Sequence, residues 1–209
     1  MSSTRLIIIR HGETVWNLEG RKHGQLDSPL TALGIRQAKA LAQRMTEESF
    51  AALYSSDLGR AVETAEIIAA RTNHEIIFDR RLRERNFGVF QGLTDEEVIE
   101  KYPLEHQARE ADKINYVIPG GESLKRYSTR VVNCLEEVAA RREGQSVALV
   151  THGGVTDSWF RYIFDIPPDA PRKVKLWNAS LNRIARDSEN GWTLHSWGDV
   201  GHLRFSSSG

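Results

Sequence analysis

The stretch LIIIRHGET at residues 6–14 runs from four apolar residues directly into an arginine and a histidine. The apolar run has the length and the β-branched content of a strand that is buried on both faces. Ligands of open α/β sheets bind beyond the carboxyl ends of such strands. The sequence therefore predicts that Arg10 and His11 lie where a substrate binds. Gly12, which follows them, permits close approach of a ligand to the main chain.

A second stretch, VALVTHGG at residues 147–154, repeats this arrangement. Again a short apolar strand ends in a histidine, His152, that is followed by a glycine. A single histidine at a strand end is often only a structural residue. Two strands that both end in His-Gly disfavour a purely structural role for both histidines. We expect His11 and His152 to face each other across one pocket, at the mouths of two parallel strands.

Strands and helices alternate along the chain, which favours a largely parallel α/β sheet. Apolar periodicity and turn residues predict, in chain order, a helix over residues 31–45, a strand over 51–54, a helix over 59–71, a strand over 75–78, helices over 94–101 and 123–142, a helix around Trp159, and a hairpin of strands over 182–186 and 192–197. The predicted fold class is a three-layer α/β/α sandwich with a mostly parallel central sheet.

Residues 80–121 differ in character from the rest of the chain, because they are charged, weakly periodic and interrupted by Pro103 and Pro119. We interpret them as a small, partly helical excursion that caps the active edge of the sheet. A chain of 209 residues is long enough for one substantial core. The expected organisation is a single domain over residues 1–209.

Bulk composition argues against several classes of partner. The formal net charge is zero, so no overall field favours nucleic acid or an anionic membrane. The single cysteine, Cys134, excludes an intramolecular disulfide and fits a reducing compartment. The first apolar run is too short for a signal peptide or a membrane span, so we expect a cytoplasmic protein. Monomer and homodimer both stay open.

The residue types at the two strand ends suit phosphoryl transfer. Arginine is always charged, and its planar fork matches phosphate oxygens. A neutral histidine can attack phosphorus, and a second, cationic histidine would stabilise charge on the transferred group. The alkoxide that leaves still requires a proton, which a carboxylic acid would supply. Since no residues show a metal-ligand spacing, we expect a reaction without a metal or another cofactor.

Several separated motifs resemble those of the histidine phosphatase superfamily, also called the phosphoglycerate mutase-like family, and they occur in the family's order. These motifs are RHGETVWN at 10–17, HGQLDSPLT at 23–31, YSSDLGRAVETA at 54–65, LRERNFG at 82–88, PGGES at 119–123 and VTHGG at 150–154. The resemblance covers nearly the whole chain and is closest to the short bacterial phosphatase branch.

The resemblance implies a role for each position that matches. His11 is the implied nucleophile, and Arg10, Arg60 and His152 are the implied cationic pocket for the phosphoryl group. Glu84 is the implied proton donor to the leaving group, and later the base that activates water. Further substrate contacts are implied for Thr14, Asn17, His23, Gly24, Phe87 and Gly153.

Two local requirements follow from these roles. A hydrogen bond from the other ring nitrogen of His11, to a nearby backbone carbonyl, would fix the tautomer that attacks phosphorus. Surrounding cations should lower the pKa of His11. Glu84 stands between Arg83 and Arg85, so we predict that both arginine side chains point away from it or are engaged elsewhere.

The same core supports hydrolysis or transfer, and two features favour hydrolysis. Phe87 stands where cofactor-dependent phosphoglycerate mutases typically have a tyrosine. Between Gly88 and Pro119 the only arginine is Arg109, whereas those mutases carry adjacent arginines for the substrate carboxylate. We favour a phosphomonoesterase that acts on a small phosphorylated metabolite through phosphohistidine. The alternative is a mutase that depends on 2,3-bisphosphoglycerate.

A third reading is a non-catalytic regulatory protein on a phosphatase core. Loss of the nucleophile or of the proton donor would mark such a protein, and His11 and Glu84 are both present. No obvious carboxylate clamp appears in the sequence, which favours broad specificity. Phe87, Val89 and Phe90 would supply an apolar wall if they face the pocket.

Overall fold

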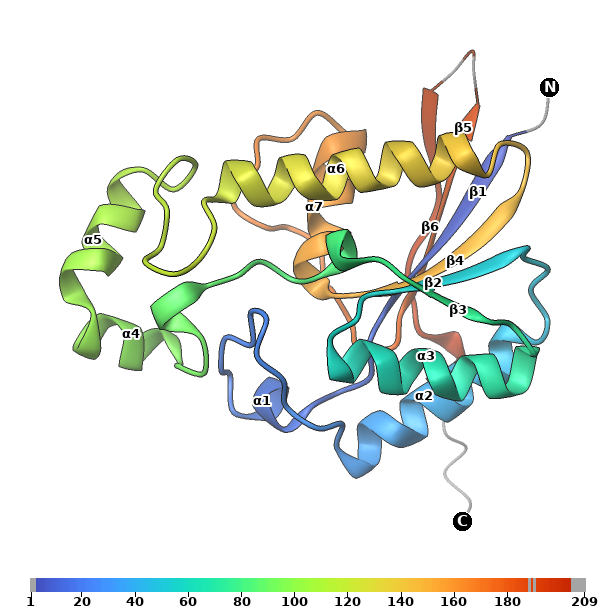
Figure 1. Cartoon of the computed structure of the whole chain (residues 1–209), viewed down its shortest axis with the longest axis horizontal. Coiled ribbons are helices and arrows are strands. Elements are labelled where there is room, and N and C mark those ends of the chain that lie inside the picture. The colour runs from blue at the N-terminus through green and yellow to red at the C-terminus, as the bar shows by residue number, and fades with distance from the viewer. Residues whose placement is uncertain (1–2, 188, 190, 204–209) are drawn as a thin grey trace.

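The computed structural model of the chain describes residues 3–187, 189 and 191–203 (Figure 1). Within these residues, six strands form one sheet in the order β3-β2-β4-β1-β5-β6, and helices cover both of its faces. The strands are β1 (Thr4–Arg10), β2 (Ala52–Ser55), β3 (Ile76–Phe78), β4 (Ser146–Thr151), β5 (Leu181–Asp187) and β6 (Gly191–Asp199). The first four are parallel, and β5 and β6 are antiparallel. The predicted α/β/α class with a mostly parallel sheet is confirmed.

Strand β1 is buried on both faces, as its apolar run predicts. Its alternate side chains enter two different cores, because successive residues of a strand point to opposite faces. Leu6 and Ile8 belong to the core beneath α6 (Leu124–Arg141) and α7 (Gly153–Ile163). Ile7 and Ile9 belong to the core beneath α2 (Ala32–Met45) and α3 (Gly59–Thr72). Burial of this one strand therefore holds the three layers together.

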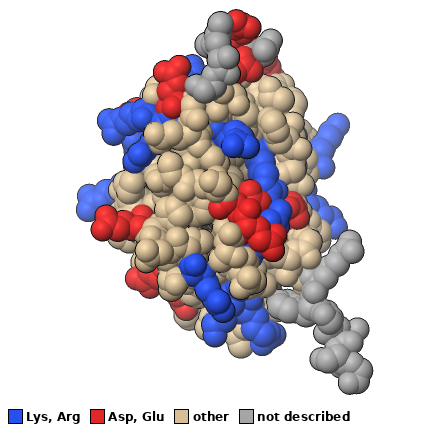
Figure 2. All heavy atoms as spheres, turned by 90° about the vertical axis from the view of Figure 1, so that its right-hand side faces the viewer, with Lys and Arg blue, Asp and Glu red and all other residues tan. Residues whose placement is uncertain are grey.

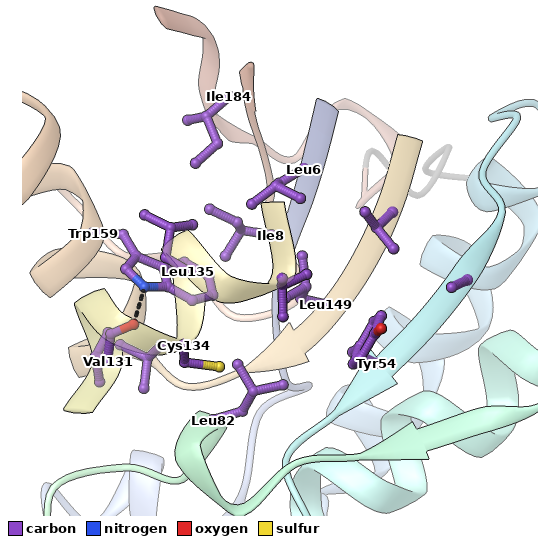
Figure 3. Close-up of a cluster of buried hydrophobic side chains, with 14 of the residues drawn as sticks. Leu6, Ile8, Tyr54, Leu82, Val131, Cys134, Leu135, Leu149, Trp159 and Ile184 are labelled. Carbon is purple, nitrogen blue, oxygen red and sulfur yellow. Dashed lines mark hydrogen bonds between the residues drawn. The ribbon is translucent and has the colours of Figure 1, made fainter. Parts of the chain in front are cut away.

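The core beneath α6 and α7 is drawn in Figure 3. Trp159 of α7 is fully buried beside Leu135 of α6. Its indole N–H donates to the carbonyl oxygen of Val131 at 2.9 Å. This bond satisfies the one polar group that the tryptophan brings into the core, so the ring adds apolar burial without a buried orphan donor.

Hydroxyl side chains cap the first turns of three helices. Thr31 caps α2 by accepting from the Gly34 N–H, and Ser123 caps α6 by accepting from the Arg126 N–H. Thr94 forms a capping box with Glu97 at the start of α4 (Asp95–Lys101). Helix α5 (Pro103–Ala111) differs from the expectation that Pro103 interrupts this segment. A proline in the first helical turn is favourable, since its missing N–H has no partner there anyway.

Residues 80–121 form the expected excursion and carry α4 and α5 at the left of Figure 1. Phe90, Val98 and Ile118 make a small core within it. Main-chain hydrogen bonds join the excursion to the loop that follows β1, which contains the short helix α1 (Val15–Leu18). The Lys22 N–H donates to Leu93 at 2.9 Å, and the Gly92 N–H donates to Lys22 at 2.8 Å. These two segments are therefore held against each other.

Charged side chains of both signs are interspersed on the face at the right-hand side of Figure 1, which is drawn in Figure 2. Among the described residues on that face, no continuous patch of one sign is visible, in keeping with a formal net charge of zero. Of the helices in the described residues, none is long and apolar enough to cross a membrane.

Candidate active site

The register of β1 and β4 brings the two strand-end histidines together. Arg10 is paired with Thr151, and the His11 N–H donates to the Thr151 carbonyl oxygen at 3.0 Å. The ring centroids of His11 and His152 are 5.3 Å apart, with the ring planes tilted by 58°. The expectation that these histidines meet at the mouths of neighbouring parallel strands is confirmed.

His11 is held in one tautomer. Its Nδ1 lies 2.7 Å from the carbonyl oxygen of Gly12, which can only accept a hydrogen bond, so Nδ1 carries the proton. The lone pair is then on Nε2. Burial, followed by the charges of Arg60 and Arg10, holds the pKa of His11 well below its usual value. The ring is therefore neutral at physiological pH, as nucleophilic attack requires.

Arg60 enters the site from the first turn of α3 and is almost fully buried. Its guanidinium donates to the carbonyl oxygens of Leu26 and Gly24, both at 2.8 Å, and to Oδ1 of Asp27 at 3.0 Å. These three acceptors fix the planar group in place. The side-chain entropy of Arg60 is therefore lost when the chain folds, and not when a substrate binds.

Arg10 extends from the last position of β1, and one of its terminal nitrogens donates to the carbonyl oxygen of Leu176. Burial lowers the pKa of Arg10 to about 10, with Glu84 opposing the shift and Arg172 adding to it. The guanidinium is thus still a cation at neutral pH, and it sits in a poorly solvated place where its charge acts strongly on an anion.

Three buried nitrogen atoms of this site have no hydrogen-bond partner. They are Nε of Arg10, Nε of Arg60 and Nδ1 of His152. In the described part of the chain only six buried side-chain atoms are in this condition, so half of them gather here. Buried polar groups are nearly always paired in folded proteins, and an anion is the partner that two guanidinium donors favour. The cluster therefore fits a phosphoryl group.

His152 itself differs from what was expected of a cationic second histidine. Burial, and then the charge of Arg60, holds the pKa of His152 well below its usual value, so the ring is neutral here. Its Nε2 lies 2.8 Å from the hydroxyl of Ser56, at the end of β2. A bound anion would oppose the shift, because a negative charge favours the protonated ring.

Glu84 reaches the same place from the excursion. Its Oε1 accepts from the Tyr127 hydroxyl and the Arg85 N–H, both at 2.8 Å, and its Oε2 accepts from the Gly154 N–H at 2.9 Å. The carboxyl group passes directly over Gly154, where a Cβ would stand 2.3 Å from Oε1. The second glycine of the His-Gly-Gly sequence at residues 152–154 therefore makes room for the carboxyl group.

The two arginines beside Glu84 are engaged elsewhere, as predicted. Arg83 forms a bidentate ion pair with Asp57, with both hydrogen bonds at 2.6 Å. Arg85 donates to the carbonyl oxygen of Glu122 at 3.0 and 3.2 Å. Neither guanidinium is therefore bound to the carboxyl group of Glu84, although the sequence places them on both sides of it.

These side chains surround a cleft of about 580 Å³. Nine of the eleven site residues named from the sequence line it: Arg10, His11, Asn17, His23, Gly24, Arg60, Glu84, Phe87 and Gly153. His152 lies next to the His11 ring without lining the cleft. The expected apolar wall is wrong in part, because Phe90 is buried in the core of the excursion and Val89 packs against that core.

The loop after β1 forms a polar wall of the cleft with Asn17 and His23. Thr14 belongs to the same loop, but its side chain does not reach the cleft surface. Thr14 is fully buried and does not line the cleft, so the implied contact with substrate is not seen. Its hydroxyl lies 2.6 Å from Nε2 of His23 and donates to Oδ1 of Asn17 at 3.1 Å. Burial lowers the pKa of His23 to about 4, so this ring is neutral. Thr14 thus orients two residues that do face the cleft.

The sequence did not point to a further wall made by the segment between α7 and β5. The residues of this segment that line the cleft are Arg172, Val174, Lys175, Leu176 and Trp177. Arg21 and Lys22, in the loop after β1, also line it. The segment has no hydrophobic periodicity from which its position in the fold could be predicted. The one usable signal was the gathering of basic residues at positions 172, 173 and 175 in a chain of zero net charge.

The positive charge that faces the cleft comes from lysine and arginine side chains. Over the described ranges 3–187, 189 and 191–203, no three His, Cys, Asp or Glu side chains gather into a group that could hold a metal ion.

The chain is similar to known proteins over nearly its whole length. A model of the histidine phosphatase superfamily (branch 1) matches residues 6–200. A metal-independent phosphoserine phosphatase of Arabidopsis thaliana is 41% identical over 204 residues, which are 96% of this chain and 83% of that protein. A probable phosphoglycerate mutase, GpmB, of Escherichia coli is 37% identical over 203 residues, covering 95% and 94%. The solved structure of Bacillus stearothermophilus YhfR, at 33% identity, superposes with a TM-score of 0.84 and covers 96% and 99%.

Proposed function

The chain belongs to the histidine phosphatase superfamily, and we propose that it hydrolyses phosphomonoesters of small metabolites through a phosphohistidine at His11. The single observation that carries the proposal is the bond from Nδ1 of His11 to the Gly12 carbonyl oxygen at 2.7 Å. It leaves Nε2 as a free nucleophile in a cleft that also presents Arg10, Arg60 and the carboxyl group of Glu84. A purely structural role for His11 would not explain a free Nε2 beside two guanidinium groups and a carboxyl group.

The proposed reaction has two steps. First, the Nε2 lone pair of His11 forms a bond to phosphorus while the bond from phosphorus to the alcohol oxygen breaks, and Glu84 gives its proton to that oxygen. Second, Glu84 takes a proton from water, whose oxygen attacks phosphorus as the N–P bond breaks. Inorganic phosphate leaves, and His11 and Glu84 return to their first protonation states.

The cationic groups stabilise charge in both steps. Arg10 and Arg60 are already fixed by backbone carbonyls, so they bind the equatorial oxygens without further ordering. Their unpartnered Nε atoms gain acceptors when the phosphoryl group arrives. Protonation of His152 beside the bound anion would add a third cation. This set of charges makes a metal ion unnecessary for the proposed reaction.

A phosphoglycerate mutase is the second candidate, because the Escherichia coli relative carries that name as a probable function. Arg109, the one arginine between Gly88 and Pro119, does not line the cleft. Arg109 is bound to Glu110 at 2.7 Å and lies over the Phe90 ring. Hydrolysis is therefore the proposal, and the substrate is a phosphorylated small molecule of the kind that the phosphoserine phosphatase relative takes.

One set of assays separates these functions. We expect purified protein to hydrolyse p-nitrophenyl phosphate equally well with and without EDTA, and His11→Ala to abolish the activity. Interconversion of 3- and 2-phosphoglycerate that exceeds phosphate release and requires 2,3-bisphosphoglycerate would replace the proposal with the mutase. An absence of both activities, with no phosphorylated protein after incubation with phosphoesters, would favour the non-catalytic reading.

A further inference from the structure

Six lysine and arginine side chains line the cleft, and Glu84 is the carboxylate among the lining residues. Arg10 and Arg60 suffice for a phosphoryl group, so four cations are in excess. Arg21 is offset by Glu19 at 2.8 Å and Glu97 at 2.6 Å, and Lys22 by Asp95, which all lie outside the cleft lining. Two cations, Arg172 and Lys175, then require a different explanation.

Lys175 has no counterion in the part of the chain that the structure describes. Its Nζ lies 4.8 Å from the centre of the Trp177 ring, which also lines the cleft. A cation held over an aromatic face keeps its positive charge but is only weakly neutralised. Lys175 therefore presents a charge that a ligand anion can bind.

Arg172 is held only loosely. Its Nε lies 3.3 Å from Oδ1 of Asp157, whose other oxygen is bound more closely by Arg161 at 2.8 Å. One carboxylate is thus shared between two guanidinium groups. About half of the Arg172 side chain is exposed, whereas Arg161 is nearly buried. Of the two, Arg172 has the charge left for another anion.

The position of Arg172 puts it on the side of the leaving group. It lines the main cleft and also an adjoining cavity of about 300 Å³, and these two spaces share Glu84, Phe87 and Gly154. Its charge contributes to the lowered pKa of Arg10, which locates it near the phosphoryl pocket. An alcohol that receives its proton from Glu84 must therefore lie within reach of this segment.

We propose that Arg172 and Lys175 form a second anion subsite, which binds a carboxylate or second phosphate on the alcohol half of the substrate. The inference rests on the proposed function and narrows its substrate to phosphomonoesters of anionic alcohols. It replaces the expectation of broad specificity, which came from the lack of an arginine pair in the excursion. The clamp here comes from the segment between α7 and β5 instead.

The test compares substrates that differ in that second charge alone. The readout is the ratio of kcat/KM for 3-phosphoglycerate to kcat/KM for glycerol 3-phosphate, and a second ratio compares fructose 1,6-bisphosphate with fructose 6-phosphate. We expect Arg172→Gln and Lys175→Gln each to lower at least one ratio roughly tenfold, because each removes a charge-assisted contact. A fall in the first ratio alone assigns the subsite to carboxylates, and a fall in the second alone assigns it to phosphates.

Lys173→Gln is the matched control, because Lys173 lies in the same segment but lines a different cavity, beside Phe160 and Ile166. Its ratios should equal those of the wild type. The proposal is wrong if Lys173→Gln lowers the ratios as much as the subsite variants do, since the effect would then be a general field. It is also wrong if the subsite variants leave both ratios unchanged.

A binding measurement keeps the subsite testable if the enzyme proves inactive. Calorimetric titration of the His11→Ala protein should show tighter binding of 3-phosphoglycerate or fructose 1,6-bisphosphate than of its counterpart without the second anionic group. Adding Arg172→Gln should remove that preference. Loss of the preference in the absence of any hydrolysis would support the subsite and overturn the phosphatase. Hydrolysis of p-nitrophenyl phosphate with no preference for a second anion would do the reverse.

Discussion

The main-chain N–H of Gly154 donates to Oε2 of Glu84 at 2.9 Å, and the carboxyl group lies so close that a Cβ at position 154 would stand 2.3 Å from Oε1. The same Cβ would lie 2.8 Å from the Tyr127 hydroxyl, which also donates to Glu84. A side chain at 154 must therefore displace the carboxyl group from the place where it could protonate a leaving group. The glycine thus connects the VTHGG sequence to the acid catalysis that we propose for Glu84.

Gly154→Ala should reduce kcat/KM for alkyl phosphates by roughly tenfold or more, because kcat/KM reports the first step and general acid catalysis contributes a factor of about 10² to 10⁴ to it. It should reduce kcat/KM for p-nitrophenyl phosphate much less, since p-nitrophenolate leaves without a proton. Steady-state kinetics with glycerol 3-phosphate and p-nitrophenyl phosphate measure the difference. An equal loss with both substrates would mean that the methyl group disturbs the phosphoryl pocket and not the acid.

The buried histidines make the stability of the fold depend on pH. The pKa values of His11 and His152 lie well below the usual value, and that of His23 is about 4, with burial as the main cause in each. The unfolded chain binds protons on these residues below about pH 6.5, and the folded chain does not. Because the unfolded state then binds more protons, stability rises with pH. We expect full stability above about pH 6.5 and a decline from there towards pH 4.

Thermal unfolding midpoints between about pH 7 and about pH 4 check this dependence. His23→Gln should make the decline shallower, because one of the titrating groups is gone. His106→Gln is the control, since His106 lies on α5 away from the cleft lining. A midpoint that rises as the pH falls over this range would contradict the burial of neutral histidines.

Asn178 connects the main chain at His11, the proposed nucleophile, to Asn17 in the polar wall of the cleft. Its Nδ2 donates to the carbonyl oxygen of His11 and to Oδ1 of Asn17, both at 3.1 Å. Asn178→Asp would remove both donors and set a carboxylate against two acceptors. We expect kcat with p-nitrophenyl phosphate to fall roughly tenfold or more, since small displacements of a reacting group are costly. Asn178→Ala, which loses the donors without the repulsion, should lose less, and equal kcat in all three proteins would exclude this positioning role.

Trp159 offers a test of the core. Trp159→Phe removes the hydrogen bond to Val131 and leaves part of the ring volume empty, which should cost roughly 2 kcal/mol of unfolding free energy. Urea unfolding monitored by circular dichroism measures the change. Trp177→Phe is the control, because Trp177 is half exposed at the cleft and should alter the unfolding free energy by much less. Equal effects of the two substitutions would contradict the packing described in Figure 3.

Local sequence patterns located the strands and the helix that position part of the site. Arg10, His11 and His152 follow apolar strands, and parallel pairing of β1 with β4 is enough to bring their ends together. Arg60 lies in the first turn of α3, a helix that periodicity locates, but only the family motif singled out this arginine for the site. Glu84 needed the family motif, because a run of charged residues is otherwise indistinguishable from an exposed surface.

Other parts depend on tertiary packing that no local pattern encodes. Thr14 was implied as a substrate contact, yet the chain folds its hydroxyl inward onto His23 and Asn17. Phe87 and Phe90 are equally apolar, and only the small core of the excursion decides which one faces the cleft. The residues near Arg172 have no periodicity at all, so their return to the cleft could be seen only in three dimensions.

We propose that Nε2 of His11 carries the phosphoryl group between substrate and water. Glu84→Gln should slow the second step more than the first when p-nitrophenyl phosphate is the substrate, because only the second step then needs the carboxylate. The covalent intermediate should accumulate and be trapped by rapid quenching into alkali, where phosphohistidine survives. Peptide mass spectrometry with ³¹P NMR then identifies the atom. We expect phosphate on Nε2 of His11; phosphate on Nδ1, on another residue, or on none while hydrolysis proceeds would show that Nε2 is not the carrier.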